Sequence, residues 1–335
     1  MDAKITKKRL SQMLSYDWMK IVLVAAAVIL VWTLVFTTTA TRIIPSQSFG
    51  IFNYCGTTVT TRFSDYPTST KDIFSYEVIE KSSQDVTTGG EEYALQIMEA
   101  RLTTDEADVL FAADIEGGYL QYTVDGETKN TTYLEDFLYR FYRYAYRLDG
   151  ENGFLAQMKT YLDGYYGGDY HNAEALNEEK IEADFRARIK KNKDKRYKKE
   201  SQIQEGLTGE IDRIQKYRQA LIDFNTYLDL GYISLTEKTL YFSDNDGNPM
   251  PITGCFSVNI CPNEKMADVK KDVYYRETVV DEETGAETTK TAATNMNIVI
   301  INDVETESGF EFERLAFINY LVQTYCTDLN GETAE

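Results

Sequence analysis

The stretch IVLVAAAVILVWTLVFTTTAT, residues 21–41, determines where the rest of the chain is placed. It contains no charged residue, no glycine and no proline. At about 1.5 Å per residue, a helix of this length is about 31 Å long, which matches the hydrocarbon thickness of a bilayer. The sequence therefore predicts a transmembrane helix at residues 21–41, preceded by a tail at residues 1–20.

The flanks of this stretch indicate its orientation in the membrane. The N-terminal side is mostly basic, with Lys4, Lys7, Lys8, Arg9 and Lys20 against Asp2 and Asp17. Basic flanks stay in the cytoplasm. We therefore expect a single-pass protein of the cell membrane with a cytoplasmic N-terminus and an extracellular C-terminal domain.

A cleaved signal peptide is the alternative interpretation of the same stretch. Thr38, Thr39 and Ala40 loosely resemble a small-residue cleavage site, although the apolar run is long for a signal peptide. Both interpretations export the rest of the chain, so they differ only in whether the anchor is retained.

Composition limits the classes of function. The chain has 335 residues, a net charge of −19 and a single histidine, His171. The acidity argues against nucleic acid as a partner, and one histidine does not by itself define a metal site or a Ser/His apparatus. Enzyme motifs such as GxSxG, HExxH, the Walker loop and GxGxxG do not occur. We therefore expect no cofactor and no enzyme, although Asp108, Asp114 and Glu116 form a conceivable glycosidase cluster.

The cysteines Cys55, Cys255, Cys261 and Cys326 follow no zinc-binding or CxxC spacing. Export permits disulfides. If Cys255 and Cys261 are the two ends of one strand, however, they lie about 20 Å apart, which is too far for a disulfide. We expect free or partly paired buried cysteines.

The first exported residues alternate between strand and helix patterns. After a spacer at residues 42–48, strands are expected at 49–54, at 73–81 and at DVLFAAD, residues 108–114. EEYALQIMEARL, residues 91–102, has the spacing of an amphipathic helix. This order predicts an α/β sheet in which helix 91–102 is the crossover connection.

Helical patterns dominate the middle of the chain. A capping-box pattern from Thr132 to Glu135 opens a helix whose predicted apolar face comprises Leu134, Phe137, Phe141, Tyr144 and Leu148. Residues 177–230 form a long charged helical region that Gly206 and Gly209 are expected to divide.

Within this region, residues 185–199 carry nine basic residues against one aspartate. Three interpretations of this basic run stay open. It is a solvated face that balances acid elsewhere, a contact with an anionic envelope polymer or lipid headgroups, or a nucleic-acid contact. The expected exterior location counts against the last of these.

The C-terminal third returns to strands and a closing helix. A hairpin is expected around the turn at Asp246 and Gly247, followed by a strand at residues 296–302. A capping box at Ser308 and Glu311 opens the last helix, whose predicted buried face comprises Leu315, Ile318, Leu321, Val322 and Tyr325.

In this order the chain resembles the extracellular solute-binding proteins of the type 2 periplasmic-binding fold. The segments that carry the resemblance are FGIFNYCG, YALQIMEARLTTDEADVLFAAD, MPITGCFSV and FERLAFINYLVQTY. The resemblance implies an N-terminal transmembrane helix followed by a bilobal α/β domain with a helix-rich second lobe. Lobe one is then expected at 49–115 and 236–328, lobe two at 116–235, and a disordered tail at 329–335.

The function that this resemblance implies is non-catalytic recognition of a small solute, such as a sugar or a peptide, in the cleft between the lobes. The expected ligand-binding residues follow lobe-one strands and are Tyr54, Thr57, Asp114, Glu116 and Tyr119. Tyrosines are expected to stack or hydrogen-bond, and carboxylates to bind hydroxyls or a cation. Beside the solute, a membrane transporter or an envelope protein is the expected partner.

A structural or assembly protein of the envelope is the alternative function. In that case the long helices at residues 177–230 form a surface for a partner and do not close a cleft.

Overall fold

The computed structural model describes residues 7–39, 48–60, 80–85, 91–104, 106–124, 126–194, 196–243, 249–280, 287–302 and 312–330. The chain divides into two compact units, Met1–Ile44 and Pro45–Glu335. Several predicted features lie outside the described residues: nearly all of the spacer 42–48, most of the strand 73–81, the turn at Asp246 and Gly247, the capping box at Ser308 and Glu311, and residues 331–335.

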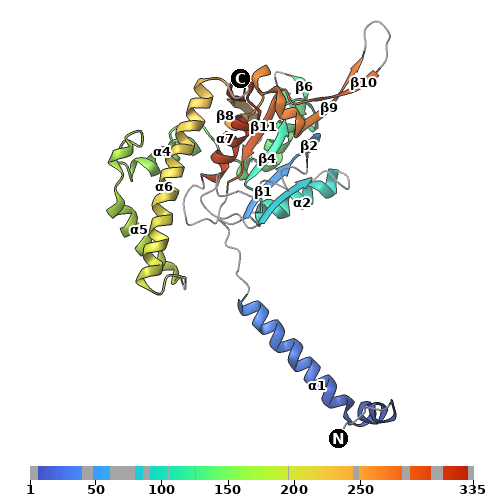
Figure 1. Cartoon of the computed structure of the whole chain (residues 1–335). Coiled ribbons are helices and arrows are strands. Elements are labelled where there is room, and N and C mark those ends of the chain that lie inside the picture. Colours follow the sequence, from blue (N-terminus) through green and yellow to red (C-terminus); the bar gives the residue numbers. More distant parts are fainter. Residues whose placement is uncertain are drawn as a thin grey trace. The chain divides into compact units, whose positions relative to one another are not determined.

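The first unit contains one long helix, α1 (Lys7–Thr39; Figure 1). Its segment Trp18–Thr37 has a mean hydropathy of 2.6 and no buried residue, and no other helix among the described residues is long and apolar enough to cross a membrane. The hydroxyls of Thr33 and Thr37 donate to the carbonyls of Ile29 and Thr33, both at 2.8 Å, so these polar groups are satisfied inside the helix. The predicted apolar helix is confirmed as one compatible with a membrane span or a signal anchor.

A six-stranded mixed sheet forms the centre of the second unit (Figure 1). Its order is β3 (Glu80–Asp85), β1 (Ser48–Asn53), β4 (Val109–Ala113), β11 (Met296–Ile300), β8 (Pro249–Asn259) and β7 (Ser234–Ser243). The first three strands are parallel, and the last three are joined by antiparallel pairing. Helix α2 (Glu91–Thr103) connects β3 to β4, where the crossover helix was predicted. The α/β class is therefore confirmed.

The remaining elements surround this sheet. A hairpin of β5 (Glu116–Val124) and β6 (Glu127–Thr132) forms a second sheet, and β10 (Glu287–Ala292), β9 (Val273–Val280) and β2 (Thr57–Val59) form a third. The other helices are α3 (Tyr133–Phe141), α4 (Phe154–Asp163), α5 (Glu178–Asn192), α6 (Glu200–Asp229), α7 (Glu313–Tyr325) and α8 (Thr327–Asn330).

Helices cover both faces of the central sheet, and this explains why β4 is one uninterrupted apolar run. Val109 and Phe111 of β4 belong to a large core that includes side chains of α4, α6 and α7. Leu110 and Ala112 point the other way, into a smaller core with side chains of α2 and α3. Among the described helices between residues 116 and 235, α3 packs on the strands in the smaller core, whereas α4, α5 and α6 contribute to the larger core and pack on one another and on α7.

The helix that begins after Thr132 is shorter than predicted. Its capping box is present, since the Glu135 amide donates to Thr132 Oγ1 at 3.1 Å and the Thr132 amide donates to Glu135 Oε2 at 2.9 Å. However, α3 ends at Phe141, and Ala145 forms an antiparallel bridge with Ile301. Backbone pairing with the end of the central sheet outweighs the helical spacing of the residues that follow.

The predicted division of the charged region at Gly206 and Gly209 is wrong, because α6 continues through both. The chain turns earlier, where Lys193 adopts a left-handed conformation with φ of 49° and ends α5. Gly206 is required by packing: a Cβ there would lie 2.4 Å from the Tyr197 ring and 2.7 Å from the Phe185 ring. A Cβ at Gly209 would meet no atom within 4 Å.

These two glycines form a matched pair for a stability test. G209A should raise the free energy of unfolding by about 0.5–1 kcal/mol, because alanine is the better helix former and has room. G206A should lower it by about 1–3 kcal/mol, because two rigid rings have to move. Chemical unfolding followed by circular dichroism measures both, and equal effects would contradict the packing argument.

A buried ion-pair cluster joins α5 to α6. Glu210 is 7% exposed and accepts bonds from both terminal nitrogens of Arg188, at 3.2 and 2.8 Å, and from Arg213 Nη2 at 2.9 Å. Burial alone would raise the pKa of Glu210, but Arg213 and Arg188 outweigh it and hold this pKa below its usual value.

The lowered pKa of Glu210 predicts that the E210Q variant loses folding stability, and that the size of this loss depends on pH. Because the folded-state pKa is depressed, the stabilisation is complete above the unfolded pKa of about 4.3 and is lost as pH falls through the folded value. E210Q should be less stable than wild type by about 3 kcal/mol at pH 7, and the difference should shrink below about pH 4. The exposed Glu205 gives the control variant E205Q, which should show a small difference at both pH values.

Candidate functional site

The residues predicted from the sequence lie around the carboxyl ends of β1 and β4. Tyr54 follows β1, Thr57 opens β2, Asp114 follows β4, and Glu116 and Tyr119 belong to β5. Because β1 and β4 are parallel neighbours, these ends meet at the same edge of the central sheet. Tyr54 and Tyr119 contact the Asp136 carboxylate there, and Asp114 contacts Lys238.

Asp136 of α3 is the centre of a first cluster and is completely buried. Its Oδ2 accepts the Tyr54 hydroxyl at 2.6 Å and Arg140 Nε at 3.1 Å. Its Oδ1 accepts the backbone amides of Tyr119 at 3.0 Å and of Leu120 at 2.9 Å. One carboxylate therefore joins β1, α3 and the β5–β6 hairpin.

Tyr54 and Thr57 are both buried, at 1% and 3% exposure. Burial, with the neighbouring Asp136 carboxylate, raises the pKa of Tyr54 well above its usual value, so its hydroxyl stays protonated and donates. The Tyr54 ring therefore supports Asp136 and is not available to stack on a ligand in this conformation. Thr57 lies on β2, which pairs with β9, and makes no contact with the charged group that the structure describes.

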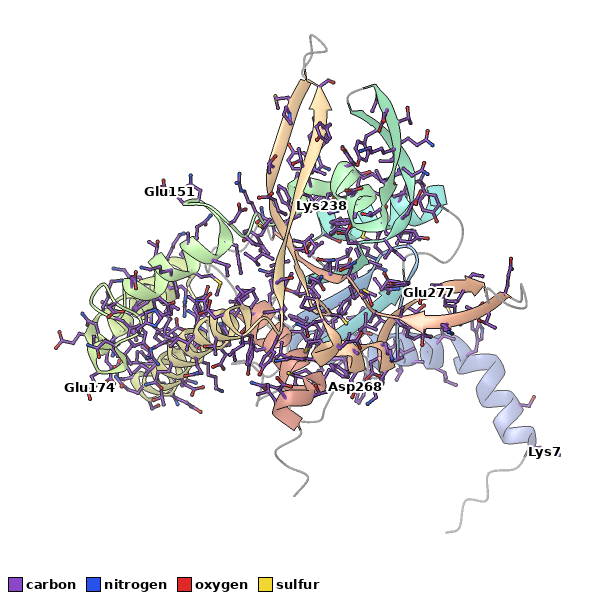
Figure 2. The ribbon with its side chains drawn as sticks, turned by 90° about the horizontal axis from the view of Figure 1, so that it is seen from above. Lys7, Glu151, Glu174, Lys238, Asp268 and Glu277 are labelled. Atoms are coloured by element: carbon purple, nitrogen blue, oxygen red, sulfur yellow. The ribbon has the colours of Figure 1, made fainter. Side chains whose placement is uncertain are left out.

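A second cluster lies beside the first. Lys238 belongs to β7 (Figure 2). Its ammonium lies 2.7 Å from Asp114 Oδ1 and 3.0 Å from Glu135 Oε1, and its side chain is 15% exposed. Burial alone would lower the pKa of Lys238, but Asp114 and Glu135 outweigh it and hold this pKa above its usual value. The cation that these carboxylates bind is thus part of the protein itself.

Glu116 and Tyr119 are the exposed members of the predicted set. Glu116 Oε1 accepts Asn130 Nδ2 at 3.0 Å, and Asn130 Oδ1 accepts Gln121 Nε2 at 2.9 Å, so a polar chain crosses the β5–β6 hairpin. The Tyr119 side chain is 49% exposed although its amide is bound by Asp136.

The conceivable glycosidase cluster does not form. Asp108 precedes β4 and Asp114 follows it, so the strand separates them by about 20 Å. Asp108 is bound at its own end of the sheet by Arg314 at 3.1 Å and by the Gly50 amide at 2.8 Å. Among the described residues, no three His, Cys, Asp or Glu side chains are placed to hold a metal ion.

An aromatic strip borders the Lys238 cluster, and sequence patterns did not reveal it. It consists of Tyr122, Tyr139, Tyr142, Tyr241 and Phe242, from β5, α3, the turn after α3 and β7. Tyr122 and Tyr241 are stacked, with ring centroids 5.8 Å apart and planes at 10°. The contacts continue from Tyr122 to Tyr139, then to Phe242 and Tyr142, with centroids 5.2–5.9 Å apart.

Part of this strip faces solvent. Tyr241 and Tyr142 are each 41% exposed. The pKa of Tyr122 is raised, mainly by burial of its hydroxyl. The charges of Glu135 and Lys238 also act on this hydroxyl, so the strip and the Lys238 cluster are neighbours. Exposed rings with charged groups beside them are a typical arrangement for recognition of an amphipathic ligand.

Among the surface hollows of the described residues, two lie away from the predicted ligand-binding residues. One, of about 360 Å³, lies between α2 and α3 and includes Glu99 and Arg140. The other, of about 150 Å³, lies between α6 and α7 and includes Asp223 and Asn319.

Asp136 should be the least replaceable residue of this site. D136N exchanges an acceptor for a donor opposite Tyr54 or Arg140, and we expect a loss of about 3 kcal/mol in the free energy of unfolding. D212N, which removes the carboxylate of the exposed Asp212–Lys216 pair, should cost less than about 0.5 kcal/mol. Equal losses for the two variants would contradict the central position of Asp136.

Comparison with known proteins supplies no relative for this geometry. Protein-family models, curated proteins and solved structures yield no match to the chain. The function is therefore inferred from contacts, burial and charge.

Proposed function

We propose that this protein recognises a small, uncharged, hydroxyl-rich solute of the sugar class, without transforming it, at the carboxyl edge of the central sheet. The observation that carries the proposal is the contact between the Lys238 cluster and the aromatic strip. It joins Asp114, the predicted residue that follows β4, to a strip of rings in which Tyr241 of β7 and Tyr142 of the turn after α3 are exposed.

The chemistry of the edge suits a sugar. The faces of a pyranose carry C–H groups that pack on tyrosine rings, and its hydroxyls both donate and accept hydrogen bonds. Exposed acceptors are available at Glu116, and the partly exposed Lys238 cluster lies beside the rings. With Asp114, Glu116, Glu135 and Asp136 against Lys238 and Arg140, the edge keeps two net negative charges, which disfavour anionic solutes.

Recognition without catalysis is proposed because the carboxylates at this edge are already engaged. Asp114 and Glu135 share Lys238, and Asp136 accepts four donors. Carboxylates with these partners serve to fix the positions of the side chains and amides that they bind. The proposal does not depend on closure of two lobes, since Pro45–Glu335 is one compact unit.

The apolar helix supports a membrane location for this recognition. A span at Trp18–Thr37 with basic residues before it would leave the N-terminus in the cytoplasm and Pro45–Glu335 outside the cell. A solute would then be bound at the cell surface, where a membrane transporter or envelope protein could receive it.

Thermal-shift screening of the full chain in detergent tests the proposal, with neutral sugars, amino acids and short peptides as probes. A sugar at a hundredfold excess over its Kd should stabilise the fold by about 2.7 kcal/mol. Y241A should weaken binding of that sugar at least about tenfold, the factor that corresponds to about 1.4 kcal/mol.

Y274A provides the matched control, because Tyr274 belongs to β9 in the third sheet. This variant should keep wild-type affinity. A shift produced only by peptides or amino acids would overturn the sugar class. Equal affinity of wild type and Y241A, or no shift with any probe, would overturn the proposed site.

A further inference from the structure

Four lysines gather where α5 meets α6, and we call them the lysine elbow. Lys190 lies in the last turn of α5, Lys193 ends that helix, and Lys198 and Lys199 precede α6. All four are exposed, and none makes a side-chain ion pair among the described residues. The elbow lies at the start of α6, whose thirty residues extend about 45 Å and lead into β7 (Figure 1).

The arginines of the same segment are not part of this free charge. Arg186 binds Glu182 and Glu200 and so ties α5 to α6. Arg188 binds Glu210, and Arg196 binds Asp194. The nearby carboxylates are thus taken by arginines, whose forked guanidinium suits a carboxylate.

The elbow is therefore a positive surface on a strongly negative chain. The whole sequence has a net charge of −19, and its average surface repels anions. Because the Debye length is about 8 Å at physiological ionic strength, only groups close to the elbow experience its charge. Its partner has to be anionic and near.

The anionic partner nearest to an anchored chain is its own membrane. The helix α1 ends at Thr39 and β1 begins at Ser48. Nine residue steps reach at most about 32 Å, so Ser48 would lie within that distance of the end of α1 in a membrane-anchored chain. The length of α6, about 45 Å, is of the same order as this maximum reach of the linker.

We propose that the lysine elbow binds the phosphate groups of anionic lipid headgroups in the membrane that holds α1. The compact unit then has two attachments to the bilayer, one through α1 and one through the elbow. This inference rests on the membrane anchor of the proposed function and is independent of the solute.

The test uses the full chain in nanodiscs of phosphatidylcholine, alone or mixed with phosphatidylglycerol. A water-soluble acetylating reagent, with mass spectrometry, reports the accessibility of Lys190. We expect acetylation of Lys190 to be about fivefold slower in the anionic discs, the factor expected for one lysine at an anionic surface. High salt should abolish the difference.

Two triple variants with the same change of charge separate the elbow from general electrostatics. K193Q/K198Q/K199Q keeps Lys190 as the reporter and should lose its protection. K129Q/K270Q/K290Q neutralises exposed lysines on β6, before β9 and on β10, and should keep it. Equal acetylation of Lys190 in both kinds of disc, or the same loss in both variants, would overturn the proposal.

Two further measurements identify which statement fails. Carbonate extraction reports the anchor alone: a chain that is extracted refutes both the anchor and the elbow, whereas a retained chain with an unprotected Lys190 refutes only the elbow. If soluble polyphosphate protects Lys190 in neutral discs while anionic lipid does not, the partner is a phosphate polymer, and the lipid assignment is wrong.

Discussion

A carboxylate removed from water needs donors for both of its oxygens, and Asp136 has four of them from three elements. Tyr54 comes from the end of β1, the amides of Tyr119 and Leu120 from β5, and Arg140 from the next turn of α3. The β5–β6 hairpin and α3 therefore have one arrangement that satisfies this charge. The position of the neighbouring Lys238 cluster depends on it, because Glu135 precedes Asp136 in the same helix.

The charged edge and the aromatic strip have different roles in the structure. The ion pairs fix the relative position of β4, α3 and β7, since Lys238 reaches Asp114 and Glu135 at once. The rings of Tyr122 and Tyr241 extend this contact outward and leave apolar surface exposed. Rigid rings beside oriented polar groups bind a ligand at little cost in conformational entropy, because few side-chain rotamers have to be ordered.

The helices α5 and α6 show the same division between structural and available charge. Glu210 and Arg213 are buried and, with the half-buried Arg188, hold the two helices together, while the four lysines of the elbow stay exposed. Gly206 has no side chain, and this lets the rings of Tyr197 and Phe185 pack closely against α6. The basic run is thus partly a structural network and partly an available surface.

The sequence by itself determined what depends on local pattern. The apolar run of α1, the buried strand at DVLFAAD, the crossover helix at residues 91–102 and the cap at Thr132 and Glu135 were all readable, because length, periodicity and capping are local properties. The candidate residues Tyr54 and Asp114 were chosen because each follows a predicted strand, and the parallel pairing of β1 and β4 in the structure places these strand ends at one edge.

Only the tertiary structure decided which side chains complete that edge. Lys238 is over a hundred residues from Asp114, and its strand has no pattern that marks it as an ion-pair partner. Asp136 looked like one acidic helix residue among 54 acidic residues, and its burial depends on contacts from distant elements. The end of α3 at Phe141 and the continuity of α6 through Gly206 were likewise decided by long-range pairing and packing, which override local propensity.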